Sequence, residues 1–437
     1  MEPSITREEF RKRASAAVQE FAESAWAEIV DAGKVERADE WMREHGSQVL
    51  RKMLGDALTA RSDRLRRLRQ GTCSCGQPVK YLQRKPVTLH SVLAGRDVDA
   101  RIWYGHCAAC GCGVFPLLRL AKVDAEGFTR PLREMALLAG VIEPYGSAQT
   151  NLLGRFAGIE ISRDKIQAEV VSEGRAAESY LKDFVPPLEP TVQPRPIYVE
   201  MDGGMVHVDT RWQEVKLGCL FREEDRVETS KDRGELVRRH VVAVRGTPEQ
   251  LWELLEPKLD VRGDQRFVVL GDGAAWIWNL AQNLKNRVEI LDWYHATEHI
   301  GEVARALYGE GTPQAESFRE KQLDRLAEDQ VEKVIESFRF LANGLEESDK
   351  RELVDRESAY LERNQERMKY RTFRKLGYDI GSGAVESAVH HVVQQRMKRV
   401  GMRWSGSGAD PMLNLRALYR THGAWDEFLG WRAANAA

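Results

Sequence analysis

The sequence of 437 residues contains no long apolar run and no export pattern at its start. No stretch approaches the roughly 20 consecutive apolar residues that cross a bilayer. The first residues, Met-Glu-Pro-Ser-Ile-Thr-Arg-Glu-Glu-Phe, lack the basic and then apolar segments of a signal peptide. We therefore expect a cytoplasmic protein with no membrane partner. Because the chain is longer than one ordinary core, about two to four domains are expected.

A large excess of charge of one sign is also missing. The 65 Lys and Arg residues nearly balance the 67 Asp and Glu residues, which gives a formal net charge of -2. This excludes a protein that binds polyanions over its whole surface, so any contact with DNA must come from local basic patches. Two segments are rich in basic residues, a pattern that is equally typical of a solvated helix face. They contain Arg61, Arg64, Arg66, Arg67 and Arg69, and Arg363, Arg367, Lys369, Arg371, Arg374 and Lys375.

Cysteine is scarce, with six residues, yet five of them lie between Cys73 and Cys112. A disulfide framework is not expected in so large a chain without an export signal. The pattern Cys73-Ser-Cys75, followed after a predicted hairpin by Cys107-Ala-Ala-Cys110-Gly-Cys112, instead predicts two knuckles that close a tetrahedral, structural zinc site. Cys75, Cys107 and Cys110 are the expected ligands, and Cys73 is preferred to Cys112 for the fourth place. The alternative is a small hairpin with reduced thiols.

A possible helix-turn-helix follows the cysteines. The turn Gly158-Ile-Glu-Ile and the N-cap candidate Ser162 separate two helical patterns in the way this motif requires. The second helix of the motif enters the major groove by its N-terminal residues, so Arg163 and Lys165 are candidate DNA-binding residues. Because sequence specifies the motif weakly, a helical hairpin that never contacts DNA is the alternative.

Beyond a proline-rich segment, the patterns run in the order strand, strand, strand, helix, strand, helix, strand. This is the order of the ribonuclease H-like fold, in which the first and fourth strands lie side by side. Asp202 and Asp272 are expected at the carboxyl ends of these two strands, each before a glycine, where they can share a metal ion. A turn-forming Asp-Gly pair is the alternative for Asp272. Cys219, in an apolar strand pattern, is expected to be a buried thiol.

Residues 296–370 are predicted to form a helical, highly charged insertion, after which Gly381-Ser-Gly-Ala-Val leads into a helix that carries Glu386. Three carboxylates on strand ends and on a nearby helix can hold a pair of magnesium ions. A helix-start carboxylate that is merely favoured by the macrodipole is the alternative for Glu386. Basic residues beyond it are expected to neutralise DNA phosphates. These residues are Arg396, Lys398, Arg399 and Arg403.

The second half of the chain resembles the DDE transposases of bacterial insertion sequences, most closely the ISKra-type group related to the Mutator-like transposases. The resemblance is carried by Met201-Asp-Gly-Gly, Gly271-Asp-Gly-Ala, Leu291-Asp-Trp-Tyr-His-Ala-Thr-Glu-His, and Gly381-Ser-Gly-Ala-Val-Glu-Ser-Ala through Arg396-Met-Lys-Arg-Val-Gly-Met-Arg-Trp. It implies that Asp202, Asp272 and Glu386 are the catalytic triad. It also matches Asp292 and His295 to a downstream pattern, in which His295 would orient a phosphate or protonate a leaving group. A purely structural Asp-His pair is the alternative.

The resemblance implies an enzyme that binds insertion-sequence ends, hydrolyses phosphodiester bonds and transfers the DNA 3′-hydroxyl to target DNA. It would use two Mg²⁺ (or Mn²⁺) ions and a structural Zn²⁺ ion. The implied partners are double-stranded DNA, as terminal inverted repeats and target, and a second copy of the chain in a homodimer, at the bacterial nucleoid. One rival is a DNA-binding regulator or domesticated transposase that keeps the ribonuclease H-like domain as a scaffold. Another is a nuclease that cuts without joining.

The expected fold class is therefore multidomain α/β: a ribonuclease H-like catalytic core with an all-helical insertion, preceded by helical, zinc-hairpin and helix-turn-helix segments. The predicted parts are an N-terminal helical region (1–70), a zinc-ribbon-like hairpin (71–118), a helix-turn-helix region (125–184), a proline-rich linker (185–196), a catalytic domain (197–295 and 371–410), a helical insertion (296–370) and a C-terminal helical tail (411–437).

Overall fold

A computed structural model describes residues 5–93, 97–184, 195–230, 233–259 and 265–435. The chain divides into two compact units, Met1–Ser172 with Ala433–Ala437, and Glu173–Arg432. Most of the predicted proline-rich linker, like the tip of the predicted cysteine hairpin, lies outside the described residues. Along the sequence, the boundary between the units falls within helix α6 (Arg163–Asp183) and not at that linker. No helix in the described ranges combines the length and apolar character that a membrane crossing requires.

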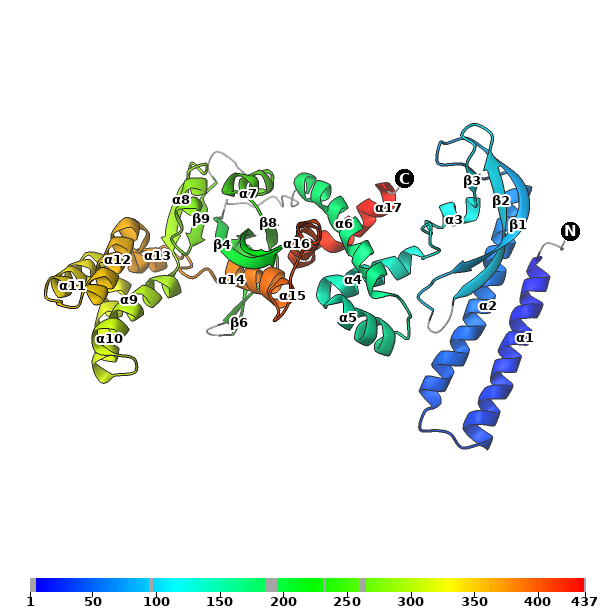
Figure 1. The fold of residues 1–437 in the computed structure, drawn as a ribbon, viewed down its shortest axis with the longest axis horizontal. Helices are drawn as coiled ribbons and strands as arrows, with labels where there is room; N and C mark the ends of the chain where they lie inside the picture. The colour runs from blue at the N-terminus through cyan, green and yellow to red at the C-terminus, as the bar shows by residue number, and fades with distance from the viewer. Residues whose placement is uncertain (1–4, 94–96, 185–194, 231–232, 260–264, 436–437) are drawn as a thin grey trace. The chain divides into compact units, whose positions relative to one another are not determined.

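The first unit begins with two long helices, as the sequence predicts. Helix α1 (Arg7–Ala25) continues into a π-helix (Trp26–Asp31), and α2 (Ala38–Arg67) runs back beside it (Figure 1). Strands β1 (Val79–Leu89) and β2 (Val98–Cys107) form the predicted antiparallel hairpin, which packs against α2. The helices thus support the strand whose end carries the second group of cysteines.

Small and polar residues of α2 let this helix pack closely against the backbone of β2. A Cβ on Gly55 would lie 2.2 Å from the carbonyl oxygen of Asp99, so the glycine lets the helix approach the backbone of β2. Strand β3 (Gly113–Val114) pairs with only a short part of β2, which leaves other backbone groups of β2 without a strand partner. Ser62 Oγ of α2 accepts the N–H of Trp103 at 2.8 Å and so satisfies one of them.

The predicted helical segment 125–184 is also helical in the structure. Its core is apolar and includes Leu132, Leu153 and Ile166, each at most 1% exposed. The helices between the hairpin and the second unit are α3 (Pro116–Leu120), α4 (Arg130–Ile142), α5 (Tyr145–Ser147), a π-helix (Ala148–Phe156) and α6.

The second unit is built on a five-stranded sheet of order β10-β9-β4-β5-β8. Strands β4 (Ile197–Val208) and β5 (Arg211–Arg222) form an antiparallel hairpin, and β8 (His240–Val244) pairs antiparallel with β5. Strand β9 (Phe267–Gly271) lies parallel to β4, and β10 (Arg287–Leu291) lies parallel to β9. All five predicted strands are confirmed, as is the predicted adjacency of the first and the fourth.

Two features of this unit differ from the prediction. A two-stranded ribbon, β6 (Arg226–Ser230) and β7 (Arg233–Leu236), leaves the sheet between β5 and β8. Its polar sequence gave no strand pattern. The predicted C-terminal tail begins earlier, with α16 (Gly406–Arg420), and belongs to the core: Thr421 Oγ1 accepts the N–H of Val241 in β8 at 2.9 Å.

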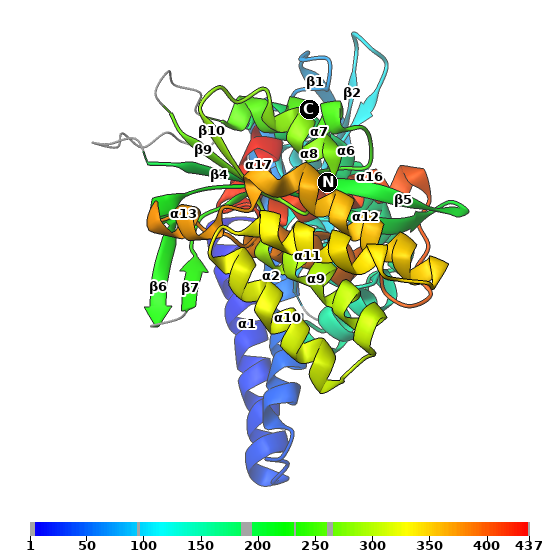
Figure 2. The ribbon, with the colours of Figure 1, turned by 90° about the vertical axis from the view of Figure 1, so that its left-hand side faces the viewer.

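Helices account for the rest of the second unit. The predicted insertion is confirmed as helical, and its helices gather in one group (Figure 2). The helices are α7 (Pro248–Leu255), α8 (Ala275–Ala281), α9 (Trp293–Tyr308), α10 (Pro313–Ala327), α11 (Val331–Asn343), α12 (Ser348–Asn364), a 3-10 turn (Gln365–Arg367), α13 (Tyr370–Lys375), α14 (Gly383–Val389), a π-helix (His390–Gln394), α15 (Gln395–Met397) and α17 (Ala424–Asn435).

His240 makes the stability of the second unit sensitive to acid. Its ring packs 5.5 Å from that of Phe184, and burial, followed by the charge of Lys258, lowers its pKa to about 4. The unfolded chain therefore binds a proton more readily between pH 6.5 and 4, so the free energy of unfolding falls as the pH falls through this window.

We predict that His240→Phe removes about 1–2 kcal/mol of the stability loss between pH 7 and pH 5. Urea unfolding of both proteins at the two pH values measures this difference. His390→Asn, a change at an exposed histidine, is the control and keeps the loss of the parent protein. An equal loss in the parent protein and His240→Phe would contradict the prediction.

Candidate functional site

The four expected thiols come together at the end of the hairpin. Atoms of Cys73, Cys75, Cys107 and Cys110 lie within 4.8 Å of one another and can hold a metal ion such as zinc. The closest pairs join the two knuckles: Sγ of Cys73 is 3.4 Å from Sγ of Cys110, and Sγ of Cys75 is 3.6 Å from Sγ of Cys107. Cys112 is exposed and stands outside the group, so the structure favours Cys73 for the fourth place, as predicted.

Backbone hydrogen bonds favour the thiolate forms of Cys73 and Cys107. A hydrogen bond from the backbone of Cys75 lowers the pKa of Cys73 to about 6, and one from the backbone of Cys110 lowers the pKa of Cys107. A hydrogen bond from the backbone of Cys112 lowers the pKa of Cys110, but side-chain contacts with Cys73, Cys112 and Cys107 raise it by more, so the net shift is upward. A metal ion, when bound, would favour the thiolate of Cys110 instead. Cys219 lies apart, buried in β5, as predicted.

The three predicted acids come from separate segments and interact electrostatically in the structure. Asp202 lies on β4, Asp272 follows β9, and Glu386 lies on α14. Burial and then repulsion by Asp272 and Glu386 raise the pKa of Asp202 to about 6, while the positive charge of His295 opposes the shift. The structure therefore brings together all four residues that the sequence singles out for catalysis.

Asp202 does not end its strand as predicted. Strand β4 continues to Val208, because its antiparallel pairing with β5 extends beyond the parallel pairing with β9, which stops at Glu200. The glycine at 204 does not form the expected turn either. A Cβ on Gly204 would lie 3.3 Å from Cγ1 of Val389, so it allows the helix that carries Glu386 to approach the strand.

Asp272 sits in the predicted turn. Gly273 has φ +97°, in the left-handed region, and the Oδ1 of Asp272 accepts the N–H of Ala274 at 2.9 Å. The hydroxyl of Tyr360 donates to the carbonyl oxygen of Asp272 at 2.6 Å. The Asp272 carboxylate thus stabilises the turn and also interacts with Asp202. The turn-forming role and a place in the site are compatible.

Asp292 joins the parts of this site. Its Oδ1 accepts the backbone N–H of His295 at 2.8 Å and contacts the Nδ1 of the same residue at 3.0 Å. Its Oδ2 accepts the N–H of Ser382 at 2.7 Å and the hydroxyl at 3.0 Å. That hydroxyl also lies 3.1 Å from Oε1 of Glu386. Ligand atoms of Asp292, His295 and Glu386 lie within 4.8 Å of one another, a second group that can hold a metal ion.

The same contacts set the charges of the pair. Although burial raises the pKa of Asp292, hydrogen bonds from His295 and Ser382 lower it below its usual range. The hydrogen bond to Asp292 raises the pKa of His295 to about 9, so the ring carries a positive charge at neutral pH. Asp292 and His295 therefore form an ion pair that faces the other acids.

Glu200 belongs to the site although the sequence analysis missed it. It is 2% exposed, two residues before Asp202 on the same face of β4, and accepts the N–H of Val385 at 2.8 Å. Burial raises its pKa to about 8. Its contact holds the first turn of the helix that carries Glu386. The one available signal was a charged residue inside the apolar run Ile197-Tyr-Val-Glu-Met.

The predicted DNA-binding cations have different surroundings. Arg396 is 1% exposed and its guanidinium lies 5.1 Å from the centre of the Trp404 ring, so its burial does not fit the predicted contact with phosphate. Trp404 is 8% exposed, which agrees with a core residue. Arg399 donates to the carbonyl oxygen of Gln395 at 2.7 Å. Lys398 and Arg403 are exposed.

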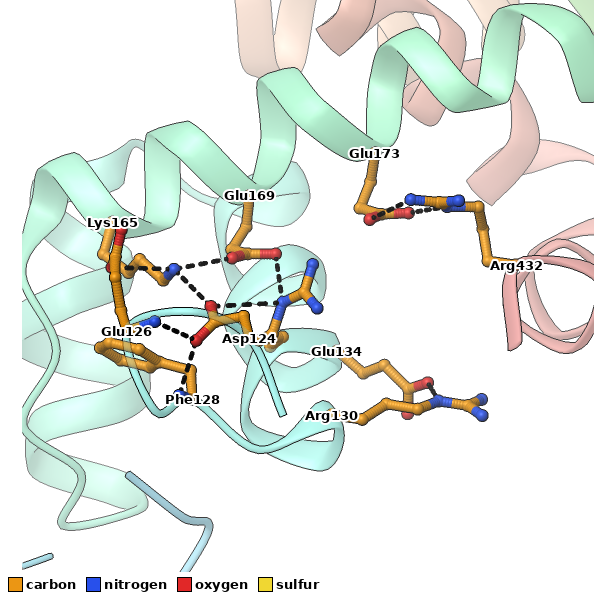
Figure 3. Close-up of polar contacts among 10 residues, drawn as sticks. Asp124, Glu126, Phe128, Arg130, Glu134, Lys165, Glu169, Glu173 and Arg432 are labelled. Carbon is orange, nitrogen blue, oxygen red and sulfur yellow. Dashed lines mark hydrogen bonds and ion pairs between the residues drawn. The ribbon is translucent and has the colours of Figure 1, made fainter. Parts of the chain in front are cut away.

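The predicted helix-turn-helix has its N-cap, because Ser162 Oγ accepts the N–H of Lys165 at 3.1 Å. The ammonium of Lys165 does not face solvent. It lies 2.7 Å from Asp124, 3.0 Å from Glu126 and 3.1 Å from Glu169 (Figure 3), and three carboxylates already neutralise it. The predicted contact with DNA therefore does not fit Lys165. It fits Arg163, whose side chain is 65% exposed.

We predict that the purified protein contains about one zinc ion per chain and that Cys75→Ser or Cys107→Ser loses it on purification, because removing one of four thiolates opens the site to water and weakens zinc binding. Metal analysis of the proteins tests this. Cys112→Ser is the matched control, since this thiol stands outside the group. Loss of zinc from Cys112→Ser, or its absence from the parent protein, would contradict the prediction.

We also predict that Glu200→Ala lowers the free energy of unfolding by about 1–3 kcal/mol, because it leaves the N–H of Val385 buried without its acceptor. Glu200→Gln retains an acceptor oxygen and should lose less than half as much. Glu253→Ala, at an exposed glutamate of α7, is the control and should be neutral. Urea unfolding measures all three. Equal losses for Ala and Gln at 200 would refute the hydrogen-bond explanation.

Comparison with known proteins places the chain in a family. The family described as "Uncharacterised protein family (UPF0236)" matches residues 122–432. The "UPF0236 protein in vanSb 3'region" of Streptococcus gallolyticus is 27% identical over 319 residues, which cover 70% of this chain and 67% of the relative. Two UPF0236 proteins of Caldanaerobacter subterraneus are each 26% identical over 181 residues, 40% of this chain, and the match spans only 36% and 34% of their length. The family match covers more than half of the chain and all the acids of the site, and the chain belongs to the UPF0236 family.

Proposed function

We propose that this protein is a DDE transposase of the ISKra type, with a ribonuclease H-like catalytic domain. The observation that carries the proposal is that Asp202 and Asp272, from two adjacent parallel strands, and Glu386, from a returning helix, lie close enough to interact electrostatically. The adjacency of the first and fourth strands of the sheet supports the ribonuclease H-like part of the proposal. The name of one Caldanaerobacter relative joins four locus designations, as suits a gene present in several copies.

The residues present fit divalent metal ions. Burial and neighbouring carboxylates raise the pKa of Asp202 to about 6, so the acids repel one another and a cation would relieve the repulsion. Their ligand atoms are oxygens, which Mg²⁺ and Mn²⁺ prefer. Asp202, Asp272 and Glu386 are the residues that would hold two ions. When bound, such ions activate the attacking oxygen and stabilise the leaving 3′-oxygen of a phosphodiester.

His295 and Asp292 would handle the substrate and the proton. The ion pair with Asp292 keeps His295 protonated and occupies its Nδ1, so Nε2 is the nitrogen that would contact a phosphate oxygen. From there it would orient the phosphate or give a proton to the leaving oxygen. The exposed Arg163, Lys398 and Arg403 would contact the backbone of double-stranded DNA, at the terminal repeats or at the target. Two ends processed together would require a homodimer.

The test is cleavage and joining of labelled duplexes that carry the ends of the host element, with Mg²⁺ or Mn²⁺. Asp202→Ala, Asp272→Ala and Glu386→Ala should each lower both activities by roughly a hundredfold or more, as expected for loss of a group that stabilises the transition state. Asp355→Ala, at an exposed aspartate of α12, is the matched control and should act as the parent protein does.

Other outcomes would favour the rival functions. Cleavage without joining under all these conditions would indicate a nuclease that does not transfer strands. Tight binding of the ends with no cleavage in either metal would indicate a regulator or a domesticated transposase, and the acids would then have only structural roles.

A further inference from the structure

The second unit contains a cavity of about 1200 Å³ beside the acid site. It is lined by residues of β4 and β5, the ribbon β6–β7, the first turn of α9, the segment from 379 to 387 and the segment from 419 to 426. We propose that this cavity binds a short unpaired stretch of DNA strand next to the acid site. The proposal rests on the proposed function, because it assumes that the acids act on DNA.

One short segment separates the cavity from the acids. Gly381 and Gly383 line the cavity, whereas Ser382 between them donates to Asp292 of the acid site. A Cβ on Gly381 would lie 3.5 Å from the ring of Tyr294, in the cavity lining, and 3.8 Å from Oδ2 of Asp292. A DNA strand that passes from the acid site over this segment would therefore reach the cavity within one nucleotide. An extended single strand covers roughly 6–7 Å per nucleotide, about twice the 3.4 Å rise in a duplex.

Aromatic rings in the lining offer surfaces on which bases stack. Tyr294 is 65% exposed, although it is a large ring at the start of a well-packed helix. Tyr419 and Trp425 form an edge-to-face pair with ring centres 5.6 Å apart. Base stacking on such rings accepts any base, because every base has a π-face. The lining therefore suits unpaired nucleotides of any sequence.

Arginines stand beside these rings. The guanidinium of Arg374 lies 5.2 Å from the centre of the Trp293 ring, and that of Arg420 lies 5.4 Å from the Tyr419 ring. Arg374 and Arg420 both line the cavity, and Arg420 also donates to Oε1 of Gln395 at 3.3 Å. The lining therefore holds both kinds of group that bind a single strand, rings for the bases and guanidinium groups for the phosphates.

The charge balance and the volume of the cavity both bear on which form of DNA it would bind. Asp379 pairs with Arg226, and Glu235 and Asp426 add negative charge to the lining, while Glu200 is engaged by Val385. The four arginines of the lining (Arg226, Arg239, Arg374 and Arg420) are thus balanced by these four acids, unlike a surface that binds the two backbones of a duplex. Its volume is close to the range of roughly 300–1,000 Å³ in which single small ligands bind. Both facts favour a few unpaired nucleotides over double-stranded DNA.

The test uses the full chain with Asp202→Ala, which prevents cleavage. Fluorescence anisotropy measures its binding to a blunt duplex and to the same duplex with a short single-stranded overhang. Adding Tyr294→Ala and Arg374→Ala together should raise the Kd for the overhang duplex about tenfold. This is the effect of losing one stacked base, at about 1.4 kcal/mol. The Kd for the blunt duplex should not change. Tyr294→Phe keeps the ring and should bind normally. Tyr308→Ala, on the same helix α9 and 37% exposed, is the matched control.

A photoreactive base in the overhang provides a second readout, with cross-links expected at Tyr294, Tyr419 or Trp425. Unchanged binding of the overhang duplex by the double variant, with no cross-link in the cavity, would overturn the proposal even if the parent protein cleaves and joins DNA. An equal loss for the blunt duplex would overturn it too. Overhang binding that depends on Tyr294, in a protein that never cleaves DNA, would support the cavity and refute the proposed function.

Discussion

The geometry of the acid site depends on the buried carboxylate of Asp292. Its backbone N–H donates to the carbonyl oxygen of Gly271 at 2.9 Å, which fixes it to the edge of the sheet. One carboxylate oxygen caps α9, where the helical insertion begins, and the other accepts from Ser382, where the chain returns 90 residues later. The helical insertion can therefore vary without moving Glu386, because both of its ends are tied to the same 0% exposed side chain.

This arrangement concentrates negative charge that the fold only partly compensates. Asp272 and Glu386 repel Asp202, and the positive charge of His295 attracts Asp202, Asp272 and Asp292. Removing a carboxylate from water costs free energy unless a partner or a proton neutralises it. Asp292 gains such a partner, whereas Asp202 keeps a raised pKa. Because a carboxylate at this position does not favour stability, the excess negative charge around Asp202 is an argument for a cationic ligand.

The sequence predicts what depends on local patterns and misses what depends on distant contacts. Apolar runs identified the strands, and the cysteine spacing identified the hairpin whose four thiols can hold a metal ion. Asp202 was assigned to a strand end because two glycines follow it, but antiparallel pairing carries β4 further. Glu200 was missed because its acceptor role needs α14, which lies far along the chain. Lys165 and Arg396 were read as exposed cations, since neither the carboxylates around Lys165 nor the burial of Arg396 is visible in a linear pattern.

The two candidate metal sites differ in ligand chemistry, and this difference follows from what each unit can bury. Around the thiols, the hairpin has a small apolar cluster, Cys73, Val79 and Cys107 with Val114 beside it, whereas Ala100 and Ile102 pack in a separate cluster with Leu65 and Leu117. A tightly held metal ion would therefore add to the stability of the end of the hairpin that carries the cysteines. Four thiolates provide such a site, and they bind Mg²⁺ poorly. The sheet has an apolar core of its own, and carboxylates beside it would hold hard cations more weakly than four thiolates would hold zinc. The ligand chemistry alone would thus keep a zinc ion in the hairpin apart from magnesium ions at the acid site.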